Sequence, residues 1–121
     1  MARPALAADP ACAAIAWPDA VADQPRRATD PDDPALSAWG DPAIIARCGL
    51  EAPPPTTTDC LRVDDVDWLV QELSDGAAFT TYGRQPAIEV LIPDAYAPEP
   101  RWLPDLAAAA ATLPHTGHSC E

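Results

Sequence analysis

The chain has 121 residues, the size of one domain, and its 16 prolines with only 21% charged residues predict one modest core wrapped in long irregular segments. Its net charge of −12, from 19 acidic and 7 basic side chains with no lysine, excludes nucleic acid as a partner, because a phosphate backbone binds clustered cations. The acidity indicates solubility at neutral pH rather than a binding site. No apolar run reaches the length of a transmembrane helix, so we expect no direct membrane insertion.

We expect residues 1–8 to form an N-terminal tail and residues 9–121 to form a single domain. Asp9 and the proline after it predict the start of a short N-terminal helix, with the aspartate as N-cap and the proline at the first helical position. Pro18 ends that helix. Residues 23–38 carry three prolines and no periodicity, which indicates a connecting loop.

Two further stretches predict strands. Residues 43–49 follow a turn, and residues 87–92 alternate apolar and other side chains along the chain. Between them, residues 51–59 (EAPPPTTTD) indicate a polyproline-like excursion that returns to Cys60.

Residues 60–93 hold most of the large apolar side chains and predict an antiparallel β-meander. The ambiguity lies in residues 64–74, where apolar residues also recur at helical spacing. Two turn signals favour strands there: Asp64-Asp65 between β-forming residues, and the segment 74–76 (SDG) before the next apolar run.

After a proline-rich connection, residues 101–112 predict a helix that Pro114 terminates. We expect Trp102 and Leu106 to be largely buried on its inner side. The predicted fold is therefore α+β: a small antiparallel β-meander of four to five strands between residues 42 and 93. We expect the C-terminal helix to pack on one face of this sheet. A short N-terminal helix and stabilising disulfides complete the predicted fold.

The four cysteines are Cys12, Cys48, Cys60 and Cys120, an even number that allows three pairings. They form no C-x-x-C pair, so neither a zinc ribbon nor a thioredoxin-type redox site is indicated. In a small, loop-rich chain we expect disulfides and an oxidising compartment; the alternative is four buried thiols in a cytosolic protein. We predict a Cys48–Cys60 disulfide, because Cys48 lies at the end of one predicted strand and Cys60 at the start of another, with the loop of residues 51–59 between them. The second bridge, Cys12–Cys120, would then fasten both termini.

The C-terminal segment supplies the candidates for metal chemistry. His115, His118 and Cys120 lie within six residues and could ligate a soft metal, but a disulfide at Cys120 would remove the thiolate. We therefore expect no metal and no cofactor. No serine lies in a nucleophile elbow and no glycine-rich phosphate loop occurs, so an enzyme is the less favoured class.

One group of side chains predicts a recognition surface. Thr80, Tyr82 and Arg84 alternate along one strand, and Trp39 and Asp41 occupy a turn that could flank them. An aromatic ring, an arginine and a carboxylate are a common composition for a binding site. The alternative places Tyr82 in the core and pairs Arg84 with an acid.

The chain resembles an actinobacterial exported family known as domain-of-unknown-function family 3515. The matching pieces run in order over nearly the whole chain: the early Cys12, QPRR at 24–27, WGDP at 39–42, RCG at 47–49, VDWL at 66–69, FTTYGR at 79–84 and VLIPDAYAP at 90–98. The resemblance implies a cell-envelope location behind an N-terminal signal or membrane anchor, and no activity. The resemblance also implies that other family members carry Asn-Gly at the position of Asp64-Asp65, which favours a hairpin turn there.

Residues 1–11 contain no continuous apolar stretch, so we expect that a signal or lipoprotein anchor has been removed. The predicted function is that of an exported cell-envelope domain, a non-enzymatic binding or scaffolding module whose partner is an envelope ligand or protein. The alternative is a small hydrolase or metal-dependent enzyme that uses the C-terminal histidines.

Overall fold

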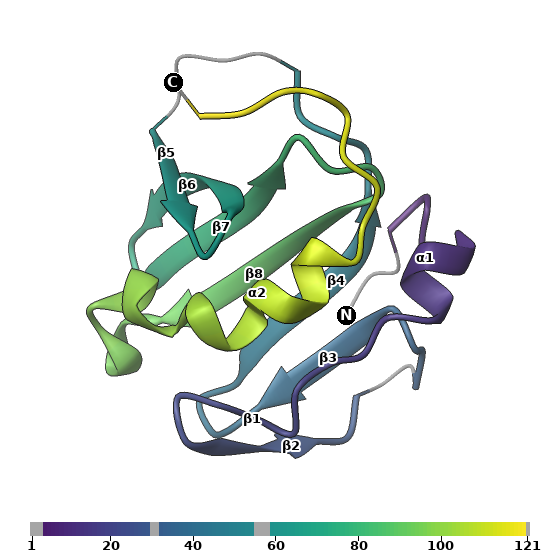
Figure 1. Cartoon of the computed structure of the whole chain (residues 1–121). Coiled ribbons are helices and arrows are strands. Elements are labelled where there is room, and N and C mark those ends of the chain that lie inside the picture. The colour runs from purple at the N-terminus through teal and green to yellow at the C-terminus, as the bar shows by residue number, and fades with distance from the viewer. Residues whose placement is uncertain (1–3, 30–31, 55–58, 121) are drawn as a thin grey trace.

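The structure is a computed structural model that describes residues 4–29, 32–54 and 59–120. Eight strands form one antiparallel sheet in the order β1-β2-β3-β4-β8-β7-β6-β5 (Figure 1). The strands are β1 (Ala20–Val21), β2 (Gln24–Arg27), β3 (Leu36–Trp39), β4 (Ile44–Leu50), β5 (Cys60–Val63), β6 (Val66–Leu73), β7 (Gly76–Tyr82) and β8 (Ala87–Pro93).

The sheet consists of two four-stranded meanders. Strands β1 to β4 pair consecutively, and so do strands β5 to β8. Within the described residues, the two meanders pair only where β4 lies beside β8, from Ile45 opposite Leu91 to Leu50 opposite Ala87. This β4–β8 seam places the last strand of the chain in the interior of the sheet.

The predicted fold, a meander of four to five strands with a packed C-terminal helix, is wrong. The sheet has eight strands, and three of them come from residues 20–39, where we expected mainly a connecting loop. Their sequence signal is weak because β1 has two residues and β2 contains Pro25 and two arginines. The turn between them places Ala22 and Asp23 at φ values of 53° and 61°, without the glycine or asparagine that normally marks such a hairpin.

Helices contribute less than predicted. The expected helix over residues 101–112 is split into a 3₁₀ turn, η2 (Glu99–Trp102), and the eight-residue α2 (Pro104–Ala111). A further 3₁₀ turn, η1 (Asp94–Tyr96), follows β8. The N-terminal helix α1 (Pro10–Ala13) is a single turn, although the predicted cap is present: the Asp9 Oδ1 atom accepts a hydrogen bond from the Ala11 N–H over 2.9 Å. None of the helices in the described residues has the length and apolar character needed to cross a membrane.

The strand alternative for residues 64–74 is confirmed. Strand β6 pairs with β5 on one side and β7 on the other, and Val63 lies opposite Val66 across the turn. Asp64 and Asp65 form that turn with φ values of 50° and 68°. Both central residues of a type I′ hairpin turn require this left-handed conformation.

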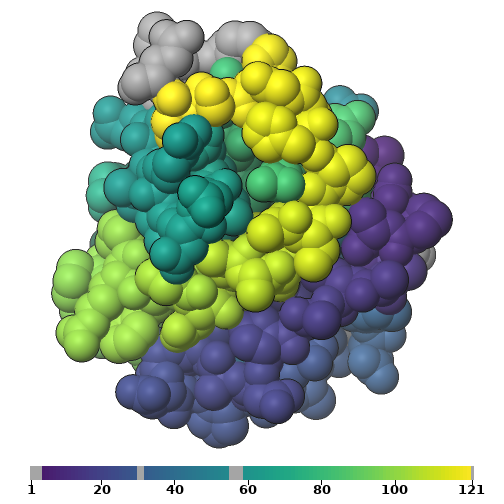
Figure 2. All heavy atoms as spheres, viewed as in Figure 1, coloured from purple at the N-terminus to yellow at the C-terminus, as the bar shows by residue number. Residues whose placement is uncertain are grey.

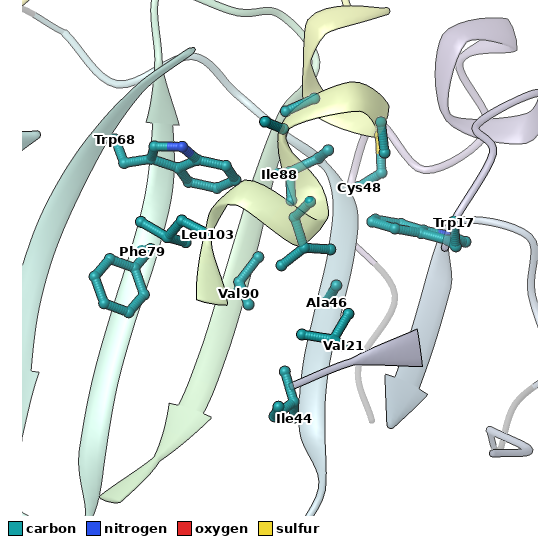
Figure 3. Close-up of a cluster of buried hydrophobic side chains, with 14 of the residues drawn as sticks. Trp17, Val21, Ile44, Ala46, Cys48, Trp68, Phe79, Ile88, Val90 and Leu103 are labelled. Carbon is teal, nitrogen blue, oxygen red and sulfur yellow. The ribbon is translucent and has the colours of Figure 1, made fainter. Parts of the chain in front are cut away.

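The core lies on one face of the sheet, which we call the core face. Helix α2 crosses this face in Figure 1. Figure 3 shows Leu103, the residue just before this helix, near strand residues such as Phe79, Ile88 and Val90. Leu106 is fully buried, as expected, whereas Trp102 is only half-buried and donates its indole N–H to the Tyr96 carbonyl. Burial of this apolar surface is the main stabilising term for the domain.

Part of the predicted N-terminal tail contacts the sheet. The Leu6 N–H donates to the Gly49 carbonyl over 2.7 Å, and Ala7 is buried in the core. A Cβ atom on Gly49 would collide with the backbone of Ala7, so only glycine permits this approach. The division into a tail of residues 1–8 and a domain of residues 9–121 stays a prediction.

Candidate functional site

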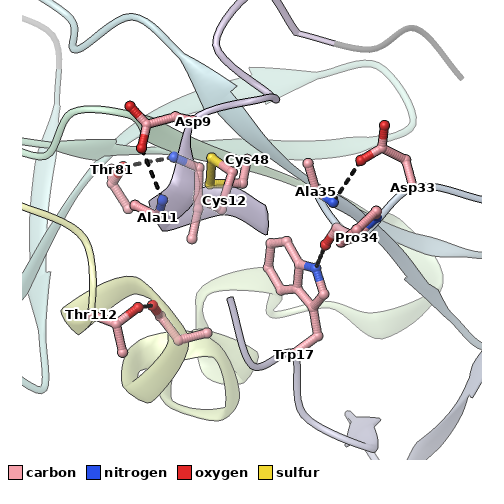
Figure 4. The surroundings of a disulfide bond; sticks show 12 residues. Asp9, Ala11, Cys12, Trp17, Asp33, Pro34, Ala35, Cys48, Thr81 and Thr112 are labelled. Carbon is pink, nitrogen blue, oxygen red and sulfur yellow. Dashed lines mark hydrogen bonds between the residues drawn. A yellow bond between two sulfur atoms is a disulfide. The ribbon is translucent and has the colours of Figure 1, made fainter. Parts of the chain in front are cut away.

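The four cysteines form two disulfides, but the predicted pairing is wrong. Cys12 is bonded to Cys48 and Cys60 to Cys120, with Cα–Cα distances of 5.5 and 5.7 Å. Cys48 and Cys60 cannot meet, because the strand order places β8, β7 and β6 between β4 and β5. Figure 4 shows the first bridge between α1 and the sheet, beside Trp17 and Thr81. The second bridge fastens the C-terminal segment to the edge strand β5.

The structure does not bring the predicted recognition residues together. Trp39 is fully buried, donates its indole N–H to the Pro18 carbonyl over 2.9 Å and packs edge-on against Trp17. Asp41 is exposed in the turn after β3. Strands β4 and β8 separate β3 from β7, which carries Tyr82.

Tyr82 and Arg84 serve the C-terminal segment instead. Tyr82 is buried under the His118 ring, which stacks on it with 5.8 Å between ring centroids. The Arg84 guanidinium donates to the Leu113 carbonyl over 2.7 Å and to the Ala111 carbonyl over 3.4 Å. Arg84 therefore satisfies carbonyl groups left free at the C-terminal end of α2.

Residues 114–120, which we call the C-terminal clasp, cross the ends of the strands in the second meander, the yellow segment at the top of Figure 2. The Thr116 N–H donates to the Gly83 carbonyl over 2.8 Å, and His115 forms a β-bridge with Arg84. Gly83 has a φ of 85°, and a Cβ atom there would collide with the His118 carbonyl oxygen. Only glycine allows the clasp to lie this close to the end of β7.

Asp67 anchors the end of the clasp. Its carboxylate accepts hydrogen bonds from the Arg62 guanidinium over 2.7 and 3.2 Å and from the Cys120 N–H over 2.7 Å. The Arg62 hydrogen bond is the main reason that the pKa of Asp67 is lowered; burial opposes the shift, and the Cys120 N–H adds to it. The side chain is 5% exposed, so these partners replace the water that it has lost.

The two candidate metal ligands, His115 and His118, do not converge. The His115 Nδ1 atom accepts a hydrogen bond from the Gly117 N–H over 3.0 Å, and the His118 ring lies on Tyr82. In the part of the chain that the structure describes, no three histidine, cysteine or acidic side chains form a group that could hold a metal ion. Cys120 is held in its disulfide.

A hollow lies on the face of the sheet opposite the core, which we call the open face. Ile45 and Leu91 face each other there across the β4–β8 seam, and neither belongs to the buried core cluster. The hollow has a volume of about 380 Å³. Its apolar lining comes from the turn before β4 and from β4, β6, β7 and β8, and it consists of Pro42, Ala43, Ile45, Leu73, Ala77, Leu91, Ile92 and Pro93.

The rim of this hollow is acidic. Asp75, in the β6–β7 turn, and Asp94, after β8, both line it and are exposed. The Asp94 N–H donates to the Asp75 carbonyl over 2.9 Å, which holds the two backbone segments together. Among its lining residues, all of which the structure describes, no side chain is cationic.

Sequence reasoning missed this hollow, although a signal for it existed. Strand β4 begins with two consecutive isoleucines, and β8 contains the run Val90-Leu91-Ile92. Because successive side chains of a strand point to opposite faces, such runs place apolar groups on both faces of the sheet.

Comparisons with known proteins identify a family and no nearer relative. Neither curated proteins nor solved structures gave a match to the chain. A family model described as "Protein of unknown function (DUF3515)" matches residues 2–116, nearly the whole length. The chain therefore belongs to the DUF3515 family of proteins of unknown function.

Proposed function

We propose that this protein is an exported cell-envelope domain that acts as a non-enzymatic binding module, and that the open face is its binding surface. The observation that carries the proposal is the hollow of about 380 Å³ beside the β4–β8 seam. Small-ligand and anchor sites are concave, mainly apolar and carry a few polar groups, and this hollow has all three properties. Leu73, at its edge, is 40% exposed.

The disulfides support a location outside the cytoplasm. All four cysteines are in disulfides, and structural disulfides persist in oxidising compartments. A separate observation supports a source in GC-rich bacteria such as actinobacteria: the basic side chains are arginines without any lysine, and the chain is rich in alanine and proline.

The binding proposal is tested by photocross-linking in the producing cell. A photoreactive residue replaces Leu73 on the open face, and in a matched control it replaces Ala108, an exposed residue of α2 on the other side of the sheet. We expect a discrete cross-linked product from position 73 and none from position 108. Equal labelling at both positions, or at neither, would contradict a specific binding surface.

The compartment is tested separately. Cells are treated with a membrane-permeant alkylating agent before lysis, and the protein is then mapped by mass spectrometry. We expect all four cysteines to escape alkylation. Labelled thiols on the folded protein would contradict export.

A further inference from the structure

The hollow on the open face combines an apolar floor with an acidic rim. Leu73 is the large apolar residue that is most exposed among the described residues, and it lines the hollow together with Ile45 and Leu91. Burying a leucine side chain is favourable, and this one stays partly in water. A partner that covers it would therefore gain binding free energy from its burial.

The rim carboxylates have no partner of their own. Asp75 and Asp94 use their backbone groups in hydrogen bonds, but neither side chain makes an ion pair or hydrogen bond within the described residues. This contrasts with Glu89 on the same sheet, whose carboxylate is paired with Arg47. The charge at the rim is therefore available to a cation from outside.

We infer that the hollow binds a segment of a partner protein in which an aliphatic side chain stands next to lysine or arginine. The aliphatic group would cover Leu73 and Leu91, and the cation would lie between Asp75 and Asp94. This inference rests on the proposed function and adds the chemistry of the partner.

Charge decides against the other occupants. Lipid headgroups and nucleotides carry phosphate, which the two carboxylates repel. A second copy of this chain brings a net charge of −12 and no lysine, so two copies repel each other over their whole surfaces.

The test is a titration by fluorescence anisotropy with three labelled hexapeptides. The first, Gly-Arg-Leu-Ile-Arg-Gly, has both features. The second replaces its arginines by glutamates, and the third replaces its leucine and isoleucine by serines. We expect the full-length protein to bind the first peptide at least about tenfold more tightly than either of the others, the effect of one lost contact of this kind.

Variants assign the binding to the hollow. We expect Leu73→Ser and the double substitution Asp75→Asn/Asp94→Asn each to weaken binding of the first peptide by about fivefold to tenfold. Asp64→Asn/Asp65→Asn is the charge-matched control at the other end of the β6 strand, and Ala108→Ser is the control for a serine elsewhere; both should bind as the native protein does. Binding through the rim should also weaken as salt rises, since mobile ions screen exposed charges.

Binding that is equal for the three peptides, absent for all of them, or unchanged in the hollow variants would overturn the inference. Self-association of the protein that Leu73→Ser abolishes, measured by sedimentation, would also overturn it in favour of a second copy. A cross-link from position 73 in cells would, in either case, leave the proposed function standing, so the two failures are distinguishable.

Discussion

The Arg62 side chain donates from Nε to the Asp67 Oδ1 atom over 2.7 Å, while the other Asp67 oxygen accepts the Cys120 N–H. One carboxylate thus holds an edge strand and the C-terminal clasp at the same point. The arginine is 57% exposed, so the ion pair alone contributes little; the buried carboxylate and its three hydrogen bonds carry the stability.

Replacing Asp67 by Asn should destabilise the protein by about 1–3 kcal/mol, because a charge-assisted hydrogen bond is lost and the amide mismatches two donors. The measurement is urea unfolding at pH 7. Asp65→Asn, at an exposed acid in the adjacent turn, is the matched control and should lie within about 0.5 kcal/mol of the native protein. A loss no larger than that of the control would contradict the role of Asp67.

The same carboxylate predicts how stability depends on pH. The folded-state pKa of Asp67 is lowered, so its contribution is fully present above the ordinary value of 3.8 and is lost as the pH falls through the lower folded value. Between pH 6 and pH 2, the free energy of unfolding should therefore decline less in Asp67→Asn than in the native protein. Parallel curves would show that another acid is responsible.

The two disulfides should differ in their resistance to reduction. Cys12 and Cys48 are fully buried, whereas Cys60 is exposed, and a reductant must reach a sulfur atom to attack it. Under increasing dithiothreitol without denaturant, alkylation and peptide mapping should find Cys60 and Cys120 labelled first. Labelling of Cys12 and Cys48 at the same reductant concentration would contradict this order.

On the chain-entropy estimate, each bridge stabilises the fold by about 4 kcal/mol.

Arg84→Ala should lower the free energy of unfolding by about 0.5–1.5 kcal/mol, because the carbonyls of Ala111 and Leu113 lose their donor. A recognition residue with no structural role would leave the melting temperature unchanged. Arg26→Ala removes an exposed arginine elsewhere and serves as the control. Equal melting temperatures for both variants would restore the recognition interpretation of Arg84.

The double substitution Asp64→Asn/Asp65→Gly should stabilise the protein by about 0.5–1 kcal/mol, since both positions have positive φ and Asn-Gly adopts that turn with less strain. Asp75→Gly in the next turn is the control, because Asp75 is not among the residues with positive φ and a glycine there should not stabilise. The melting temperatures are measured by calorimetry. A melting temperature of the double variant at or below that of the native protein would contradict the prediction.

The second meander could be predicted because its signals are local. The Asp64-Asp65 turn separates two short β-forming runs, and Ile88, Val90 and Ile92 alternate along one strand, so turn and period agree. The first meander could not, since β1 and β2 together contain six residues and lack an alternating apolar pattern.

The disulfide pairing failed for a different reason. Cys48 and Cys60 are close in the sequence, and closing the short excursion between them looked favourable. Their separation is fixed by the position of β8, which inserts between β4 and β7 and so moves β5 to the far edge. No local feature of residues 48–60 carries that information. The acidic rim of the hollow was hidden in the same way, because Asp75 and Asp94 meet only when β7 and β8 pair.

The pairing that the structure adopts has a consequence for how the protein matures. In chain order the first cysteine is bonded to the second and the third to the fourth, and each bridge closes within its own meander or the segments attached to it. An oxidant that joins thiols in the order in which they emerge during synthesis or translocation therefore produces the native bridges directly. Maturation should then need an oxidase but no isomerase, because no early bond has to be broken before the β4–β8 seam forms.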